Sequence, residues 1–393
     1  MLFAALAGFI TAAAEPGPRP RARELGIAAL IGGTPGRFDA ITDVPGVEVG
    51  HTTLVEAERV RTGVTIIHPR GRAQTNDPVF AGWNMLNGNG EMTGTAWIEE
   101  SGYLEGPVGI TNTYSVGVVR DSITRWQVAN PGFELWGLPV VAETYDGGLN
   151  DITGFHVKEQ HVLAALDGAH GGPVEEGNVG GGTGMICHRF KGGIGTASRV
   201  LPPAAGGYTV GVLVQCNYGV RPLLSVAGVP VGQEIADQLP CLVGDAPSTR
   251  GVTLRCDQAA RNHAASDDIE MGSIIVIVAT DAPLLPHQLK RLTRRVPLGV
   301  GRMGGMGGNT SGDIFLAFST ANPGLYAQKG SAPAQQLAND AINPLFDATV
   351  QATEEAITNA LLAARTMTAN GLRVYELPQD RLLQALRKYR RLP

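Results

Sequence analysis

Apolar residues gather in runs of four to eight positions along the chain, and turn-forming residues separate these runs. Aliphatic and β-branched side chains dominate the runs, which is typical of strands buried on both faces. The runs predict strands at residues 64–67, 138–143, 208–215, 273–279 and 313–319. Clusters such as Asp43-Val44-Pro45-Gly46 and Tyr145-Asp146-Gly147-Gly148 predict turns between elements.

Three other stretches carry helical signals. Residues 152–167 place apolar side chains at helical spacing. Thr280 and Asp281 are predicted to cap a helix that has prolines in its first turn and basic side chains near its other end. Residues 334–368 predict one or two further helices. Strands, interspersed helices and a late strand favour stacked sheets covered by helices, an α+β fold. Because no linker divides the chain, we expect residues 15–393 to form one domain.

Composition supports a folded chain. Of the 393 residues, 17% are charged and 43% are hydrophobic, and the net charge is −5. No block is dense in lysine or arginine, so we expect no nucleic-acid partner. After residue 14 no apolar run reaches the roughly 18 residues that span a bilayer, so we expect no membrane partner.

The first 14 residues are apolar and end in three alanines, which resembles a secretory signal without its basic start. This pattern predicts a periplasmic or secreted protein; the alternative is a cytoplasmic protein whose first residues form a docked apolar helix. None of the four cysteines forms a CxxC pair. Cys241 and Cys256 bracket a loop-like stretch and could form a disulfide in an exported protein.

The sequence gives no support for three familiar catalytic or cofactor-binding motifs. The glycines at 299, 301 and 304 match a dinucleotide-binding fingerprint, but they follow a predicted helix and lack the later acidic residue. His156 and His161 do not form an HExxH zinc motif, and no Gly-x-Ser-x-Gly elbow is present. We therefore expect neither a metal nor another cofactor.

Three other motifs have ordinary structural interpretations when each is taken alone. Residues 178–185 form a glycine-rich loop, Gly272-Ser273 precedes an apolar strand, and residues 309–313 form a polar cluster at a strand entrance. Taken together they resemble the self-cleaving aminopeptidases of the DmpA type, which are L-aminopeptidase/D-amidase/D-esterases and β-peptidyl aminopeptidases. The resemblance rests on five ordered blocks, at residues 139–147, 178–185, 214–219, 272–291 and 311–318.

The resemblance implies a four-layer αββα sandwich like that of N-terminal-nucleophile hydrolases, with different strand connectivity. It also implies that the precursor cuts itself between Gly272 and Ser273. The products would be an α chain of residues 15–272 and a β chain of residues 273–393, which stay paired and assemble as a homo-oligomer. The substrate would be a short peptide, amide or ester with a free amino terminus.

The chemistry of such a site is physically sound. A serine hydroxyl needs a base to become a good nucleophile. A freed α-amino group, with a reference pKa of about 7.7–8.0, can be that base on Ser273 itself. Gly272 allows the backbone strain that brings the hydroxyl to the preceding carbonyl.

The resemblance also assigns supporting roles. Asn217 would donate to the oxyanion, Tyr145 would donate to the intermediate, and Ser311 with Asp313 would orient and polarise the amino group of the nucleophile. Ordinary alternatives are a turn-forming role for Asn217 and a packing role for Tyr145.

Substrate selection is assigned to two further residues. Glu143 would pair with the free amino terminus of the substrate, which disfavours endopeptidase activity. Trp136 would form an apolar pocket wall, or else it belongs to the core. Residues 237–268 form a longer stretch than expected, which could alter access or specificity.

Two alternatives stay open. One is a self-cleaving acyltransferase of the ornithine acetyltransferase type, although that group typically has threonine at the cleavage point. The other is a non-catalytic exported binding protein, which would remain uncut.

Overall fold

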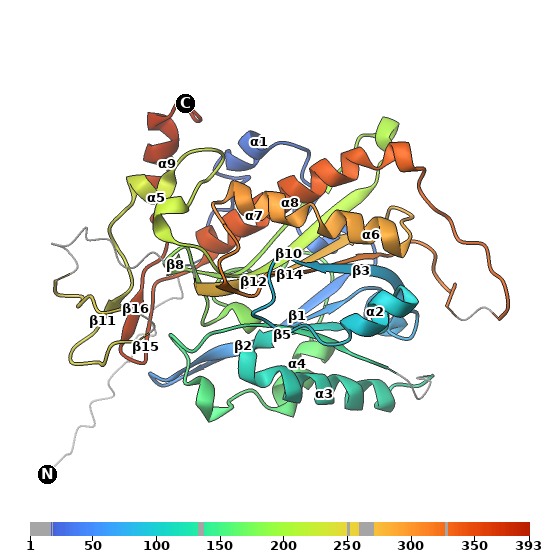
Figure 1. Ribbon diagram of the computed structural model, residues 1–393, viewed down its shortest axis with the longest axis horizontal. Helices are drawn as coiled ribbons and strands as arrows, with labels where there is room; N and C mark the ends of the chain where they lie inside the picture. Colours follow the sequence, from blue (N-terminus) through green and yellow to red (C-terminus); the bar gives the residue numbers. More distant parts are fainter. Residues whose placement is uncertain (1–16, 18, 133–136, 250–251, 259–270, 327–328) are drawn as a thin grey trace, which may run out of the picture.

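The computed structural model describes residue 17 and residues 19–132, 137–249, 252–258, 271–326 and 329–393. The signal-like segment of residues 1–14 lies outside the described residues. Two β-sheets stack face to face in the middle of the molecule, and helices cover the outer face of each sheet (Figure 1). This is the predicted αββα layering.

The smaller sheet has four strands in the order β1-β2-β5-β6. Their bounds are β1 Glu48–Glu56, β2 Val60–His68, β5 Val108–Asn112 and β6 Val140–Thr144. Helices α3 (Val116–Ala129) and α4 (Glu159–Asp167) cover its outer face. Because helices lie on one side and the second sheet on the other, every residue of β2 is buried.

The larger sheet has the order β4-β3-β14-β12-β10-β9, with the short strand β13 beside β12. Its bounds are β3 Val79–Met85, β4 Tyr103–Leu104, β9 Gly193–Val200, β10 Thr209–Asn217, β12 Met271–Thr280, β13 Thr310–Ser311 and β14 Ile314–Ser319. Strand β12 runs antiparallel to β10 and parallel to β14. The central strands are therefore paired on both edges and covered on both faces, which explains their continuous apolar sequences.

Helices α6 (Pro286–Thr293), α7 (Val296–Arg302) and α8 (Asn343–Ala363) cover the outer face of the larger sheet (Figure 1). Apolar side chains fill three layers: between these helices and the sheet, between the two sheets, and between the smaller sheet and α3 and α4. None of the helices in the described part of the chain combines the length and the apolarity that crossing a lipid bilayer requires.

Smaller elements surround this sandwich. The helices are α1 Ile27–Ile31, α2 Thr95–Ser101, α5 Val231–Glu234 and α9 Gln379–Lys388. Strands β7 (Ile186–Cys187) and β8 (Phe190–Lys191) form a hairpin. A third sheet has the order β11-β16-β15, with bounds Cys241–Leu242, Leu372–Val374 and Met367–Ala369.

Two sequence predictions about helices need correction. The predicted cap at Thr280 and Asp281 is wrong, because Thr280 ends β12 and its hydroxyl donates to the carbonyl of Thr209, while Asp281 Oδ1 accepts from Thr209 N. Helix α6 begins later, at Pro286. The helix predicted over 152–167 begins only at Glu159, after a short 3-10 turn and a left-handed residue at Phe155.

The four cysteines form two disulfides. Cys241 pairs with Cys256, with 4.9 Å between their Cα atoms, as the bracketed loop suggested. Cys187 pairs with Cys216, which the sequence did not predict. These two residues are 29 positions apart in the sequence, and only the fold of the β7–β8 hairpin against β10 brings them together.

Candidate active site

Ser273 is the third residue of the central strand β12 and is 5% exposed. It lies opposite Asn217, the last residue of β10, in the antiparallel pair. Its Oγ accepts a hydrogen bond from the Gly312 amide at 3.1 Å. Because β10 and β14 flank this strand, the serine is held on a rigid part of the fold rather than on a loop.

The peptide bond before Ser273 lies inside the same strand. Gly272 pairs with Ser311 on β13 and has a φ of 135°, which L side chains rarely adopt. A Cβ atom on Gly272 would lie 1.9 Å from the backbone oxygen of Asn217. Glycine is thus required on two grounds: the backbone angle and the close approach of β10.

Ser311 and Asp313 form a buried hydrogen-bonded pair beside this bond. The Ser311 hydroxyl donates to Asp313 Oδ1 at 2.6 Å, and the Ile274 amide donates to the same oxygen at 3.2 Å. Since Ile274 directly follows Ser273, the carboxylate of Asp313 is tied to the backbone of the nucleophile strand.

Sequence reasoning missed Asn87, which holds Asp313 from the other side. Its Oδ1 accepts from the Asp313 amide at 2.7 Å, and its Nδ2 donates to Asp313 Oδ2 at 3.3 Å and to the Gly308 carbonyl at 3.2 Å. The only signal in the sequence is the abundance of glycine and asparagine in residues 81–109.

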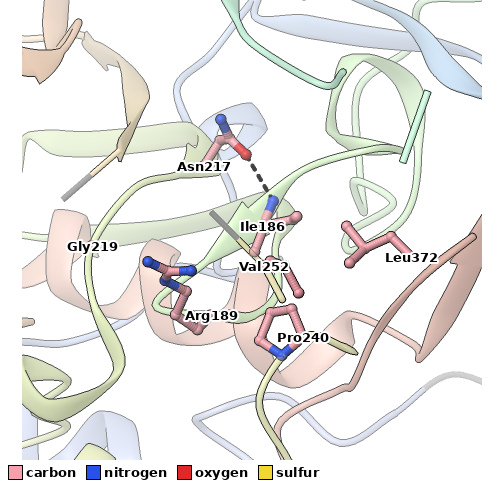
Figure 2. A pocket seen from close by; sticks show the side chains of 7 residues that line it. All are labelled: Ile186, Arg189, Asn217, Gly219, Pro240, Val252 and Leu372. Carbon is pink, nitrogen blue, oxygen red and sulfur yellow. Dashed lines mark hydrogen bonds between the residues drawn. The ribbon is translucent and has the colours of Figure 1, made fainter. Parts of the chain in front are cut away.

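The side-chain amide of Asn217 has a fixed orientation. Its Oδ1 accepts from the Ile186 amide at 2.8 Å, which Figure 2 shows as a dashed line, and its Nδ2 donates to the Tyr145 carbonyl at 3.0 Å. The oxygen is therefore occupied by the β7–β8 hairpin, and the NH₂ group is the end that faces the smaller sheet. This orientation makes Asn217 a hydrogen-bond donor in the site.

Tyr145 enters the site through its backbone carbonyl, which bonds to Asn217. Its side chain is half-buried and its phenol lies alongside Gly147, where a Cβ atom would come within 2.3 Å of the hydroxyl. The structure thus brings Tyr145 next to Asn217 at the end of β6.

Glu143 is buried at the end of β6 with two hydrogen-bond donors. Its Oε1 accepts from the Glu91 amide at 3.1 Å, and its Oε2 accepts from the Thr113 hydroxyl. Burial raises the pKa of Glu143 above its ordinary value, against the opposing effect of these hydrogen bonds. Sequence reasoning did not find Thr113 or Glu91.

Gly90 packs against both Glu143 and Gly312, the residue whose amide contacts the nucleophile. A Cβ atom on Gly90 would lie 3.3 Å from Glu143 Oε1 and 3.0 Å from the Cα of Gly312. Gly312 in turn donates to Ser273. The carboxylate of Glu143 therefore approaches Ser273 from the β14 side.

Two predictions cannot be placed in the same way. Trp136, the predicted pocket wall, lies outside the described residues. Among the residues that the structure describes, no group of three or more histidine, cysteine, aspartate or glutamate side chains could hold a metal ion.

Comparison with known proteins agrees with this geometry. Peptidase family S58 matches residues 39–374. The β-peptidyl aminopeptidase BapA of Sphingosinicella microcystinivorans is 53% identical over an alignment of 401 positions, which covers 99% of this chain and 97% of that protein. The protein of the same name from Sphingosinicella xenopeptidilytica is 47% identical over 94% of this chain and 91% of its own length.

Solved structures show the same relationship. A β-aminopeptidase from a Burkholderia species is 51% identical with a TM-score of 0.82, over 95% of this chain and all of the other. The L-aminopeptidase D-Ala-esterase/amidase of Ochrobactrum anthropi is 45% identical with the same TM-score and coverage, and it is described as a prototype serine aminopeptidase with a variant of the Ntn hydrolase fold. With its αββα layers and a serine at the start of a central strand, this chain belongs to peptidase family S58 and is a serine aminopeptidase of that family.

Proposed function

We propose that the chain cuts itself between Gly272 and Ser273 and then acts as a β-peptidyl aminopeptidase. The observation that carries this proposal is the position of the 272–273 bond, which lies between Asn217 on one side and Ser311 on the other. The relatives named β-peptidyl aminopeptidases match nearly the whole chain and support the substrate class.

Self-cleavage needs no group beyond this site and water. Ser273 Oγ adds to the carbonyl carbon of Gly272, the C–N bond breaks, and the nitrogen of Ser273 takes the proton that the hydroxyl loses. Water then hydrolyses the resulting ester, which leaves a carboxylate on Gly272 and restores the hydroxyl. The φ of 135° at Gly272, which glycine adopts readily, would let the Ser273 hydroxyl approach the preceding carbonyl as the first step requires.

The freed amino group of Ser273 then serves as the base for substrate. It takes the Oγ proton as Oγ attacks the substrate carbonyl, and it returns a proton to the leaving amine. Asn217, which lies opposite Ser273 in the strand pair, would donate from Nδ2 to the oxyanion that forms. Water finally hydrolyses the acyl-enzyme.

Ser311 and Asp313 would hold the new amino group in place. Asp313 Oδ1 already accepts from the Ser311 hydroxyl and the Ile274 amide, so a third donor completes a compact cluster. A carboxylate favours a protonated amine, and these two hydrogen bonds to Oδ1 offset part of that effect. Tyr145 would add a hydrogen bond to the intermediate.

Glu143 would bind the ammonium group of the substrate. Among the described residues the buried carboxylate accepts two hydrogen bonds, and a carboxylate has acceptor capacity for a cation beyond these. This anchor explains why the enzyme would act at free amino termini and not within chains. Trp136 remains the proposed apolar wall.

The compartment and the assembly are also part of the proposal. Two disulfides favour an oxidising environment, so we propose export to the periplasm or beyond. The α and β chains would remain paired, and the pairs would form a homo-oligomer.

The proposal is tested by intact mass spectrometry with N-terminal sequencing of the purified protein. We expect a fragment that begins at Ser273 and has a mass of about 13 kDa, in proportion to 121 of 393 residues and 41.1 kDa. The Ser273→Ala variant should stay whole. β-Alanyl and L-alanyl p-nitroanilides, each with and without an added amine acceptor, then separate hydrolysis from acyl transfer. A stable single chain in the wild type would remove the amino base and refute the mechanism.

A further inference from the structure

A small pocket opens beside Asn217 and has a volume of about 40 Å³. Figure 2 shows the side chains that surround it, which come from separate segments of the chain. Its lining residues are Ile186, Arg189, Asn217, Gly219, Pro240, Val252 and Leu372. Asn217, whose side chain the Ile186 amide orients, links this pocket to the site around Ser273.

Pro240 and Val252 form one wall of the pocket, and both belong to the described part of the long stretch that begins at residue 237. The Cys241–Cys256 disulfide closes its described part, and strand β11 pairs with β16, which places Leu242 opposite Leu372. Val252 bonds to Thr249 through its backbone in both directions. This wall is thus covalently and structurally tied to the third sheet.

Arg189 is held in the opposite wall by its backbone. The fully buried Arg221 donates from Nη2 to the Arg189 carbonyl at 2.8 Å and from Nε to the His188 carbonyl at 3.0 Å. The β7–β8 turn is therefore anchored, and Arg189 is the single charged residue among the seven that line the pocket.

The pocket and Glu143 lie on opposite flanks of the nucleophile. Strand β12 lies between β14 and β10 in the sheet. Glu143 approaches Ser273 through Gly90 and Gly312 at the entrance of β14, whereas Asn217 ends β10. A substrate whose amino terminus binds Glu143 and whose scissile carbonyl lies at Ser273 would therefore extend toward the pocket.

We propose that this pocket binds the leaving residue of a dipeptide substrate, with its apolar walls against the side chain and Arg189 paired with the C-terminal carboxylate. The inference rests on the proposed function, because the direction of the substrate depends on Glu143 as its anchor. It adds a preference for short peptides that end in a free carboxylate one residue after the scissile bond.

Size and charge both fit this ligand. The pocket volume is about 40 Å³, and on the same measure a water molecule needs about 10–15 Å³. The pocket therefore has room for roughly three water-sized groups, which matches a small aliphatic side chain. The planar guanidinium of arginine matches the two oxygens of a carboxylate. A longer peptide would have an amide in place of that carboxylate and would lose the ion pair.

The first test compares two substrates that differ only in this carboxylate, β-alanyl-L-alanine and β-alanyl-L-alaninamide. We expect the Arg189→Gln variant to lower kcat/KM for the free acid by about 10- to 100-fold, the range of one charge-assisted hydrogen bond, and to leave the amide within about twofold. Arg125→Gln, at an exposed ion pair on α3, is the matched control and should change neither. Equal losses on both substrates, or no loss on either, would overturn the proposal.

A second variant tests the apolar wall without removing a charge. Val252→Trp should fill the pocket and lower kcat/KM for β-alanyl-L-alanine, while β-alaninamide, whose leaving group is ammonia, keeps its rate. Val128→Trp, at an exposed site on α3, is the control. If both substrates slow equally, the pocket does not bind the leaving residue. If the wild type hydrolyses none of the three substrates, the proposed function itself fails.

Discussion

Replacing Gly272 by alanine should slow self-cleavage strongly without preventing folding. The added Cβ would lie 1.9 Å from the Asn217 oxygen, and real Cβ atoms essentially never come closer than 3.0 Å to such an atom. The backbone must therefore move by at least 1.1 Å, the difference between these distances. A misplacement of about 1 Å at a reacting centre can cost roughly 100-fold in rate. We expect self-cleavage to slow by about that factor.

The assay is a time course of the 13 kDa fragment after synthesis in a cell-free system, with the melting temperature of each precursor as a folding check. Gly228→Ala is the matched control, because Gly228 also has a positive φ, 80°, but a Cβ there would meet nothing within 4 Å. The control should be cut at the wild-type rate. A folded Gly272→Ala precursor that is cut as fast as the wild type would refute the reasoning, because cleavage would then tolerate a displacement of about 1 Å at the bond.

Three further predictions concern the surroundings of the nucleophile. Asn87→Leu removes both hydrogen bonds to Asp313, so kcat should fall about 10- to 100-fold with KM little changed. Asn76→Leu, which removes an exposed hydrogen bond to the Pro131 carbonyl, is the control. A change confined to KM in Asn87→Leu would contradict this role. Because burial raises the pKa of Glu143, binding of the substrate ammonium should weaken as pH falls, with a midpoint above the ordinary value of 4.5. KM measured at pH values on both sides of 4.5 tests this, and a midpoint below 4.5 would argue against it. Burial also raises the pKa of Asp146 from 3.8 to about 7, so the stability contributed by its protonated form is complete below pH 3.8 and is lost as pH rises through 7. The melting temperature of Asp146→Asn minus that of the wild type should therefore be larger at pH 8 than at pH 4. An equal difference at both pH values would exclude the effect.

Much of the sandwich could be predicted from the chain because its central strands are buried on both faces. The run at 273–279 lies within β12, and the run at 208–215 overlaps β10 in all but its first residue. The start of helix α6 could not be predicted in the same way. The side chains of Thr280 and Asp281 suit a cap, but both bond to Thr209 on the neighbouring strand, a contact that local sequence does not reveal.

The site was predicted in part. Family resemblance located Ser273, Asn217, Ser311 and Asp313, and the structure brings these four together, although their catalytic roles stay predictions. Asn87 could not be predicted, because its place in the site depends on hydrogen bonds to a segment more than 200 positions away. No periodicity or motif marks such a contact.

The central position of β12 has a consequence for how the protein can recover from denaturation. Before the proposed cut, folding is a single-molecule event and its yield does not depend on concentration. After the cut, residues 273–319 still supply β12 and β14, the inner strands between β10 and β3. Refolding the processed protein would then require two separate molecules to meet, each lacking the other's half of the sheet. Its recovery should fall on dilution, whereas the uncut Ser273→Ala chain should refold equally well at any dilution.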